Sequence, residues 1–450
     1  MRANPALTLT AAFLAMILVG AAAFLLIGFE TGGESPRPLT ALFTAASAVC
    51  VTGLTVVDLS REMDFRGQLV TLLLIQIGGL GVLSLSNWIL FSVRGRMGPR
   101  GSLLANRVMG GAAPLSPARF LNRVMLYVFA CEAAGAALLF LRFLSEAPPR
   151  RALWLALFHS VSAFCNAGFT LFPSSLSAYR ADPVMNGIIV FLILAGGIGF
   201  TAAVDLGGAL AALAGRRRRR ISFHTRTVLV ATAILLAGGF LAFLLFEWGN
   251  TFRGVSGKMI FLQSLFLSVT ARTAGFHTVP TGHLSNLTLV ALILLMAVGA
   301  SPGSTGGGVK TTSAAIVWAM IRGQVLNRRR TEIFGRTVPF SMVAKALAVI
   351  LIYFLVVMAA MVAVQAFEFG ERPHVETRGL FLEHLFEVVS ALSTVGLSTG
   401  VTGRLADGSL GVLILCMFAG RVGPLVLVSS LIGERKRHSY SYPEADILVG

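Results

Sequence analysis

The sequence predicts an all-α polytopic membrane protein built from four similar units, and three observations lead to this class. Of the 450 residues, 55% are apolar and only 13% are charged, whereas a soluble domain is about 25% charged. The apolar residues form long runs, such as 7–29 and 344–367, and a helix needs roughly 20 apolar residues to cross a bilayer. A short glycine-containing motif also recurs four times along the chain.

The first apolar run, residues 7–29, is expected to be a retained membrane helix. The apolar part of a signal peptide is shorter, roughly 7–15 residues, and a site of small residues for cleavage follows it. This run is longer and no convincing site of that kind follows it.

The net charge of +17 is concentrated in three linkers, 94–118, 214–226 and 322–339, which together hold fifteen arginines and one acidic residue, Glu332. Basic linkers between apolar segments mark the cytoplasmic side of a membrane protein. The run Arg216–Arg220 is also suited to anionic lipid. The location of the charge therefore favours membrane lipids as partners and argues against nucleic acid.

The recurring motif ends in Gly53, Gly168, Gly275 and Gly396, which are 115, 107 and 121 residues apart. Each glycine is followed by Leu or Phe and preceded by a short apolar stretch, at 39–49, 152–164, 260–271 and 380–392. A dozen residues are too few to cross a bilayer. Longer apolar segments flank each stretch, at 7–29 and 67–93, 119–144 and 184–213, 226–247 and 285–321, and 340–367 and 410–432.

Each unit is therefore predicted to be a helix, a half-helix, a loop and a second helix. The three basic linkers join consecutive units, and all three carry the positive charge that marks the cytoplasmic side. Because consecutive linkers lie on the same side, each unit must cross the membrane an even number of times. The half-helix is then re-entrant, and eight crossings leave both termini in the cytoplasm. The expected divisions are units at 1–93, 119–213, 223–321 and 340–432, followed by a cytoplasmic tail at 433–450.

Loops at membrane depth are tolerated only where they line a water-filled path, so the four loops are expected to meet on one axis with pseudo-fourfold symmetry. Rings of backbone carbonyls can replace the hydration shell of an ion, and glycine allows the backbone angles that such a ring needs. The alternative is that these glycines only pack helices together. Four copies after four half-helices favour an ion filter made of Val51, Thr52, Gly53, Asn166, Ala167, Gly168, Thr273, Ala274, Gly275, Thr394, Val395 and Gly396.

The four motifs, with sequences such as Cys50-Val-Thr-Gly-Leu-Thr and Ser393-Thr-Val-Gly-Leu-Ser, resemble the filters of the Trk/Ktr/HKT superfamily of potassium transporters. The resemblance covers essentially the whole chain and is greatest to Ktr-type pore-forming membrane subunits. It implies four helix–pore-loop–helix repeats around one ion path in the plasma (inner) membrane of a bacterium. It also implies K⁺ as the transported ion, a homodimer, and gating by a cytosolic ring of nucleotide-binding RCK subunits. Na⁺ stays open as a second ion.

The last segment of the third unit is interrupted by a glycine-rich stretch that contains Gly299, Ser301, Pro302, Gly303, Gly306, Gly307, Gly308 and Lys310. A phosphate-binding loop requires glycine immediately before the lysine, but Val309 stands there. Proline and glycines form a poor helix, so this stretch is expected to face the cavity. It also resembles the intramembrane gating loop of the superfamily.

Arg421 lies within the last apolar segment, at a depth where a charge must face the cavity or a partner. Two interpretations stay open: a fixed cation that forms part of the gate, or a structural arginine that satisfies loop carbonyls. The family has an arginine at this motif.

Two other functional classes compete with a gated cation pathway. An alternating-access symporter is usually recognised by paired broken helices in two related halves, whereas this chain has four repeats. A membrane enzyme would need clustered acid–base or metal-binding residues within the spans, and the seven histidines are scattered. We therefore expect a cation-conducting protein that is not an enzyme and carries no covalently bound cofactor.

Overall fold

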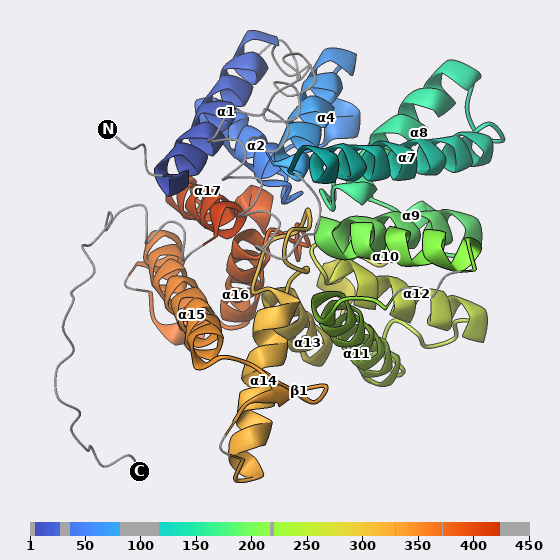
Figure 1. Ribbon diagram of the computed structural model, residues 1–450. Helices are drawn as coiled ribbons and strands as arrows, with labels where there is room; N and C mark the ends of the chain where they lie inside the picture. The colour runs from blue at the N-terminus through green and yellow to red at the C-terminus, as the bar shows by residue number, and fades with distance from the viewer. Residues whose placement is uncertain are drawn as a thin grey trace.

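The computed structural model describes residues 5–27, 37–81, 117–216, 220–328, 330–370 and 372–423, and these residues are mostly helical (Figure 1). The predicted tail 433–450 and most of the first basic linker lie outside the described residues.

The longest apolar helices begin the four units. Among the described residues, the helices that are long and apolar enough to cross a membrane unbroken are α1 (Pro5–Ile27), α7 (Pro117–Phe143), α11 (Phe223–Phe246) and α15 (Phe340–Phe369). They expose large apolar side chains, among them Leu26 (88%) and Leu245 (70%). Such surfaces are unfavourable in water and favourable in lipid. The predicted class, a polytopic helical membrane protein, is confirmed.

A short half-helix follows each of these long helices, as predicted. The half-helices are α2 (Pro38–Cys50), α8 (Pro149–Phe164), α12 (Gly257–Thr270) and α16 (Leu380–Leu392). Proline stands in the first turn of α2 and α8, where its missing N–H costs no helical hydrogen bond. The C-terminal halves of all four are almost completely buried, so their ends lie in the interior of the protein.

The helices that close the units, called inner helices below, are α4 (Phe65–Leu80), α9 (Pro183–Gly197), α13 (Asn286–Ala297) and α17 (Asp407–Val422). Side-chain caps from Asp64, Asp182 and Ser285 accept backbone N–H groups at the starts of the first three. Each inner helix is shorter than the apolar segment that predicts it.

The prediction that the segment 184–213 forms one membrane helix was wrong. In the second unit the segment forms α9 and α10 (Phe200–Ala214), which are bent by 106°. Gly199, with φ of 93°, stands at this bend, in a conformation that ends a right-handed helix. Gly81 and Gly423 end α4 and α17 with φ of 79° and 95°. In the third unit, residues 298–310 separate α13 from α14 (Thr311–Val325).

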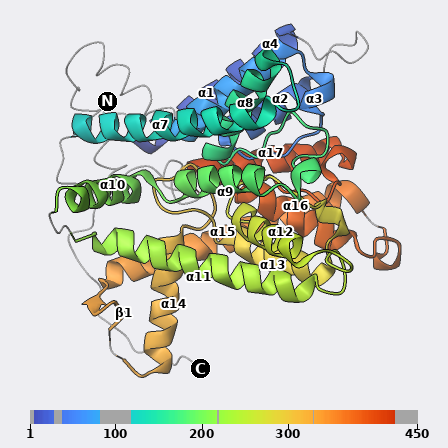
Figure 2. The same cartoon turned by 90° about the vertical axis from the view of Figure 1, so that its right-hand side faces the viewer.

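The remaining elements are short. They are α3 (Leu59–Glu62), η1 (Ser177–Tyr179), η2 (Thr281–His283), η3 (His374–Glu376), η4 (Thr402–Arg404) and a hairpin of β1 (Glu332–Ile333) with β2 (Arg336–Thr337). Figure 2 shows that α14 and the hairpin extend away from the other helices. Phe334 of this hairpin lies under the Arg226 guanidinium, 4.4 Å from ring centroid to Cζ.

Helix contacts run around a closed cycle. Each half-helix packs against the long helix before it and the inner helix after it in the chain, with α13 of the third unit the exception. Each inner helix also contacts the half-helix of the next unit: α4 with α8, α9 with α12, α13 with α16, and α17 with α2. The fourth unit therefore meets the first, and the ends of the half-helices are brought to the centre (Figure 1).

Candidate functional site

The loops that follow the half-helices, 51–53, 166–168, 273–275 and 394–396, are called the glycine loops. Each has a positive φ at its first and third residue, at Val51 and Gly53 (57° and 92°), Asn166 and Gly168 (59° and 71°), Thr273 and Gly275 (69° and 79°), and Thr394 and Gly396 (51° and 90°). Four non-glycine residues in the left-handed region are unusual, and such strain persists only where the surroundings enforce it. The repeated sequence therefore adopts one repeated and strained backbone conformation.

The amides of the glycine loops point back toward the half-helices. The N–H groups of Thr52, Ala167 and Val395 donate to the carbonyls of Ser47, Ser162 and Ser390, each at 2.8 Å. Ala274 donates to Thr270 at 3.0 Å. Within the described residues, no donor bonds to the carbonyl oxygens of the glycine loops. The loops therefore have bonded amides on one side and unbonded carbonyls on the other.

The four glycines lie against one another in a ring. A Cβ atom added to Gly53 would clash with the carbonyl oxygen of Ala167, and one added to Gly168 would lie 2.9 Å from the Cα of Gly275. A Cβ on Gly275 would lie 2.5 Å from the Val395 oxygen, and one on Gly396 would clash with the Thr52 oxygen. The cycle closes in the order of the units. Only glycine fits both the backbone angle and the space.

A cavity of about 320 Å³ opens directly above this ring. All four loop glycines line it, together with residues of the segments that follow them, such as Asp58, His277 and Ser398. We call these following segments the mouth loops; they comprise residues 54–59, 169–175, 276–280 and 397–403.

Residues 298–310, called the central loop, lie against the opposite side of the ring from this cavity. A Cβ on Gly306 would clash with the hydroxyl of Thr273, and one on Gly307 with that of Thr394. Both threonine hydroxyls are buried without a hydrogen-bond partner in the described part of the chain. The glycines of the central loop therefore allow it to touch two of the four glycine loops.

The central loop is also bonded to the break between α9 and α10. Ser301 N donates to Gly197 O at 3.2 Å, Thr305 N to Gly196 O at 3.4 Å, and Phe200 N to Gly303 O at 2.9 Å. Across the loop, Val298 pairs with Val309 in a single parallel bridge. Lys310 donates from Nζ to Gly306 O at 2.7 Å, so its charge is held by the loop itself.

Arg421 joins the central loop to the first unit. Its guanidinium donates to the carbonyls of Thr305 and Gly78, with that of Gly79 at 3.2 Å. The carbonyls of Gly78 and Gly79 belong to the last turn of α4, where helix carbonyls lack the usual partner four residues on. The Gly78 oxygen also accepts from the Gly81 N–H at 3.2 Å. The structure thus brings together the central loop and Arg421, which are more than a hundred residues apart in the sequence.

Two buried polar side chains of the half-helices were not singled out from the sequence: His159 in α8 and Glu387 in α16. They are 0% and 1% exposed, and each precedes its loop glycine by nine residues. A polar residue at a shared offset in apolar half-helices is a signal that the sequence contains.

The geometry can be compared with known proteins. The family model of TrkH, described as a cation transport protein, matches residues 4–436. The potassium/sodium uptake protein NtpJ of Enterococcus hirae is 34% identical, over 100% of this chain and 98% of that protein. Ktr system potassium uptake protein B of Bacillus subtilis is 33% identical, over 100% and 97% of the two chains. The crystal structure of the potassium transporter TrkH from Vibrio parahaemolyticus is similar in fold, with a TM-score of 0.72, 21% identity, and coverage of 94% of this chain and 84% of that chain.

Proposed function

Because this chain belongs to the TrkH family of cation transport proteins, we propose that it takes up potassium across the plasma membrane of a bacterium through the ring of glycine loops. The proposal includes the four units at 1–93, 119–213, 223–321 and 340–432, with both termini in the cytoplasm. The full-length relatives named as potassium uptake proteins support the choice of ion.

The unbonded carbonyls of the glycine loops carry this proposal. A filter for K⁺ uses carbonyl oxygens in place of the ion's water shell. Here the N–H groups of the glycine loops donate to carbonyls of the half-helices. Among the described residues, four carbonyls of the loops then have no donor: those of Thr52, Ala167, Ala274 and Val395. The C-terminal ends of four half-helices add partial negative charge at the same place. The hydroxyls of Thr273 and Thr394, which have no hydrogen-bond partner among the described residues, supply further oxygen atoms on the side of the central loop.

The central loop is proposed as the gate, with Arg421 as its latch. The loop lies directly against two glycine loops and is attached through carbonyls and amides that a small shift can release. A fixed cation beside a cation path also raises an electrostatic barrier. These two effects act in the same direction, because both favour a closed path while Arg421 holds Thr305.

The gate is proposed to respond to a cytosolic RCK-type ring that binds a nucleotide and docks on the basic linkers. The name of the Bacillus subtilis relative places that protein in a Ktr system. The chain is proposed to act as a homodimer. Cross-linking in native membranes tests the dimer, and a monomer that transports at the full rate would refute it.

The test of function is potassium uptake by cells that lack their own uptake systems. We expect growth at low K⁺ and uptake of a potassium tracer when the chain is expressed with an RCK partner, and much less without the partner. Uptake that saturates with Na⁺ and requires its inward gradient would favour the alternating-access symporter instead. Sodium belongs in this assay because the Enterococcus hirae relative is named for both ions.

A further inference from the structure

We propose that Glu387 and His159 are positioning residues that hold two opposite mouth loops against their half-helices and thereby set the preference for K⁺ over Na⁺. The inference rests on the proposed function of the glycine loops. It concerns side chains behind those loops, which do not touch the ion.

Glu387 joins its half-helix to the mouth loop of the fourth unit. Its Oε1 accepts from the Ser398 hydroxyl at 2.6 Å and from the Thr399 N–H at 3.1 Å, and its Oε2 accepts from the Thr402 hydroxyl at 2.7 Å. A carboxylate that is 1% exposed is stable only with such partners. One side chain therefore holds three residues of a loop that lines the cavity.

His159 makes the equivalent contact in the second unit. Its Nδ1 lies 2.7 Å from the carbonyl oxygen of Leu155, so this nitrogen carries the proton and donates. Nε2 is then an acceptor, and the N–H of Leu171 donates to it at 3.3 Å. Leu171 and Thr399 both stand three residues after their loop glycines. In both units, therefore, the residue nine positions before the loop glycine bonds to the N–H of the residue three positions after it.

The other two units lack an equivalent acceptor arrangement at this offset. Thr44 of the first unit donates to the carbonyl of Thr40 within its own helix, at 2.8 Å. Phe266 of the third unit has no polar side-chain atom. Because the ring closes in the order of the units, the second and fourth units face each other. The mouth is therefore held by side chains from two opposite half-helices.

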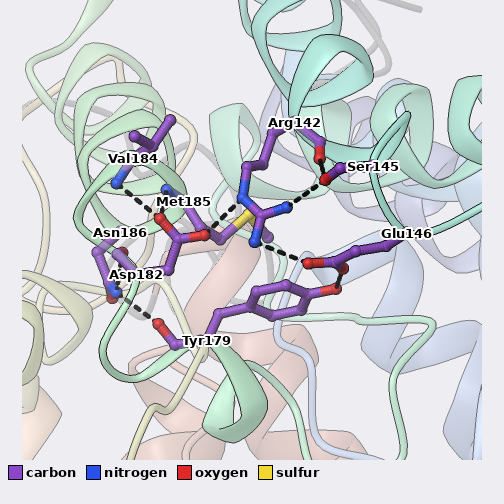
Figure 3. A network of polar contacts seen from close by, with 8 residues as sticks. All are labelled: Arg142, Ser145, Glu146, Tyr179, Asp182, Val184, Met185 and Asn186. Carbon is purple, nitrogen blue, oxygen red and sulfur yellow. Dashed lines mark hydrogen bonds and ion pairs between the residues drawn. The ribbon is translucent and has the colours of Figure 1, made fainter.

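The mouth loop of the second unit is also anchored at its far end. Phe172 stacks on the His159 ring at 4.5 Å and packs against Tyr179 at 5.3 Å. Figure 3 shows Tyr179 bonded to Glu146, and Arg142 between Glu146 and Asp182. These contacts attach the segment to α7 and to the start of α9, so that His159 acts on a loop that is fixed beyond it.

The physical consequence is a fixed orientation of the filter carbonyls. The peptide groups at 397–399 follow Gly396 directly in the chain. If they became mobile, the carbonyl group of Gly396 would become mobile with them. Selection between ions of one charge depends on the spacing and mobility of the carbonyl ring. Loss of a hydrogen bond to a charged acceptor changes the equilibrium between the held and the released loop by about tenfold or more. We expect Glu387→Leu to lower the K⁺-over-Na⁺ preference by about tenfold.

Two variants separate positioning from stability. Glu387→Gln keeps an oxygen for Thr399 and gains an amide that can donate to Thr402, so we expect it to retain most of the preference. Glu247→Leu is the matched control, because Glu247 is 0% exposed and accepts from Ser285, Thr251 and Asn250 at 2.8–2.9 Å. It joins α11 to the start of α13 and does not line the cavity. It should lower the amount of folded protein without changing the ratio of ions.

The measurement is tracer K⁺ uptake with competing Na⁺, in transport-deficient cells expressing the full chain with its partner. Hydrogen exchange of the purified variants provides a second readout that does not depend on transport. We expect faster exchange at 397–403 in Glu387→Leu, and at 170–173 in His159→Leu, than in Glu247→Leu. An unchanged ion ratio in folded Glu387→Leu, or an equal change in Glu247→Leu, would overturn the proposal. If the unaltered chain transports no K⁺, the proposed function fails, while exchange still tests whether the two residues hold the loops.

Discussion

Replacing Arg421 with alanine removes the guanidinium that joins the central loop to α4, and we expect potassium flux in the absence of a partner to rise. The bond from Arg421 to the carbonyl of Thr305 is charge-assisted, and such bonds contribute about 2 kcal/mol. A loss of that size shifts a two-state equilibrium by about 30-fold. The bonds of Ser301, Thr305 and Gly303 to the α9–α10 break remain, so the loop keeps a folded position and loss of the latch raises the flux by about this factor. Loss of the charge barrier adds to that rise.

Arg421→Lys separates the two effects of the arginine. Lysine keeps the positive charge but lacks the planar fork that reaches two carbonyls at once, so it should retain the barrier and lose much of the latch. We expect its basal flux to lie between those of the unaltered chain and Arg421→Ala. Arg253→Ala, which removes an exposed arginine of the α11–α12 loop, is the control and should leave the flux unchanged.

A double-mutant cycle tests whether the arginine and the central loop act together. Deleting residues 303–306 removes Thr305, the acceptor of Arg421, and should raise basal flux by itself. Adding Arg421→Ala to this deletion should then raise the flux less than it does in the intact chain, since the shared contact is already lost. Flux is measured as tracer uptake into vesicles without the partner. If all three variants fold and none raises the flux, the central loop is only a helix break.

Three further outcomes are expected. Gly396→Ser should weaken K⁺-over-Na⁺ selection, because a Cβ there would clash with the Thr52 carbonyl; Gly403→Ser, on the same cavity but without neighbours within 4 Å, should not. Gly307→Ala should raise basal flux by displacing the central loop from the Ser393 carbonyl, 2.9 Å from the added Cβ, and equal flux would count against the contact. Burial raises the pKa of Asp182, but backbone N–H groups of α9 and Arg142 outweigh it, so the pKa lies below the ordinary 3.8. The stability this contributes is present above pH 3.8 and is lost as the pH falls through the lowered pKa; thermal unfolding of Asp182→Asn should lose this pH dependence.

The half-helices and glycine loops could be predicted because local sequence determines them. Each copy of the motif combines an apolar stretch too short to cross a bilayer with a glycine at a fixed position. A single copy could be a helix-packing glycine, but four copies at the same place in four units favour a shared loop structure. The central loop was found for a similar reason, since Pro302 and its neighbouring glycines do not form a stable helix. The roles of these residues as filter and gate remain predictions.

The break between α9 and α10 and the positioning residues were missed for two different reasons. The residues before Gly81 and Gly199 are apolar and continue apolar runs, so their composition is that of a continuous helix. Only the fold determines that these two glycines take a positive φ. Glu387 and His159 bond to loops that fold back eleven to fifteen residues later, and hydrophobic periodicity contains no information about those contacts.

The differences among the four units explain why one chain holds all of them. Four identical subunits would place a central loop and an arginine in every unit, whereas in this chain the central loop touches only two of the four glycine loops through Gly306 and Gly307. Here one unit supplies the loop, the next supplies Arg421, and the first supplies the carbonyls of α4 that hold the other side of the guanidinium. The common backbone of the glycine loops is kept in all four units, while the parts above and below it differ. Repetition thus provides the ring, and divergence of the repeats provides the single contact of Arg421 with the central loop that we propose as the latch of the gate.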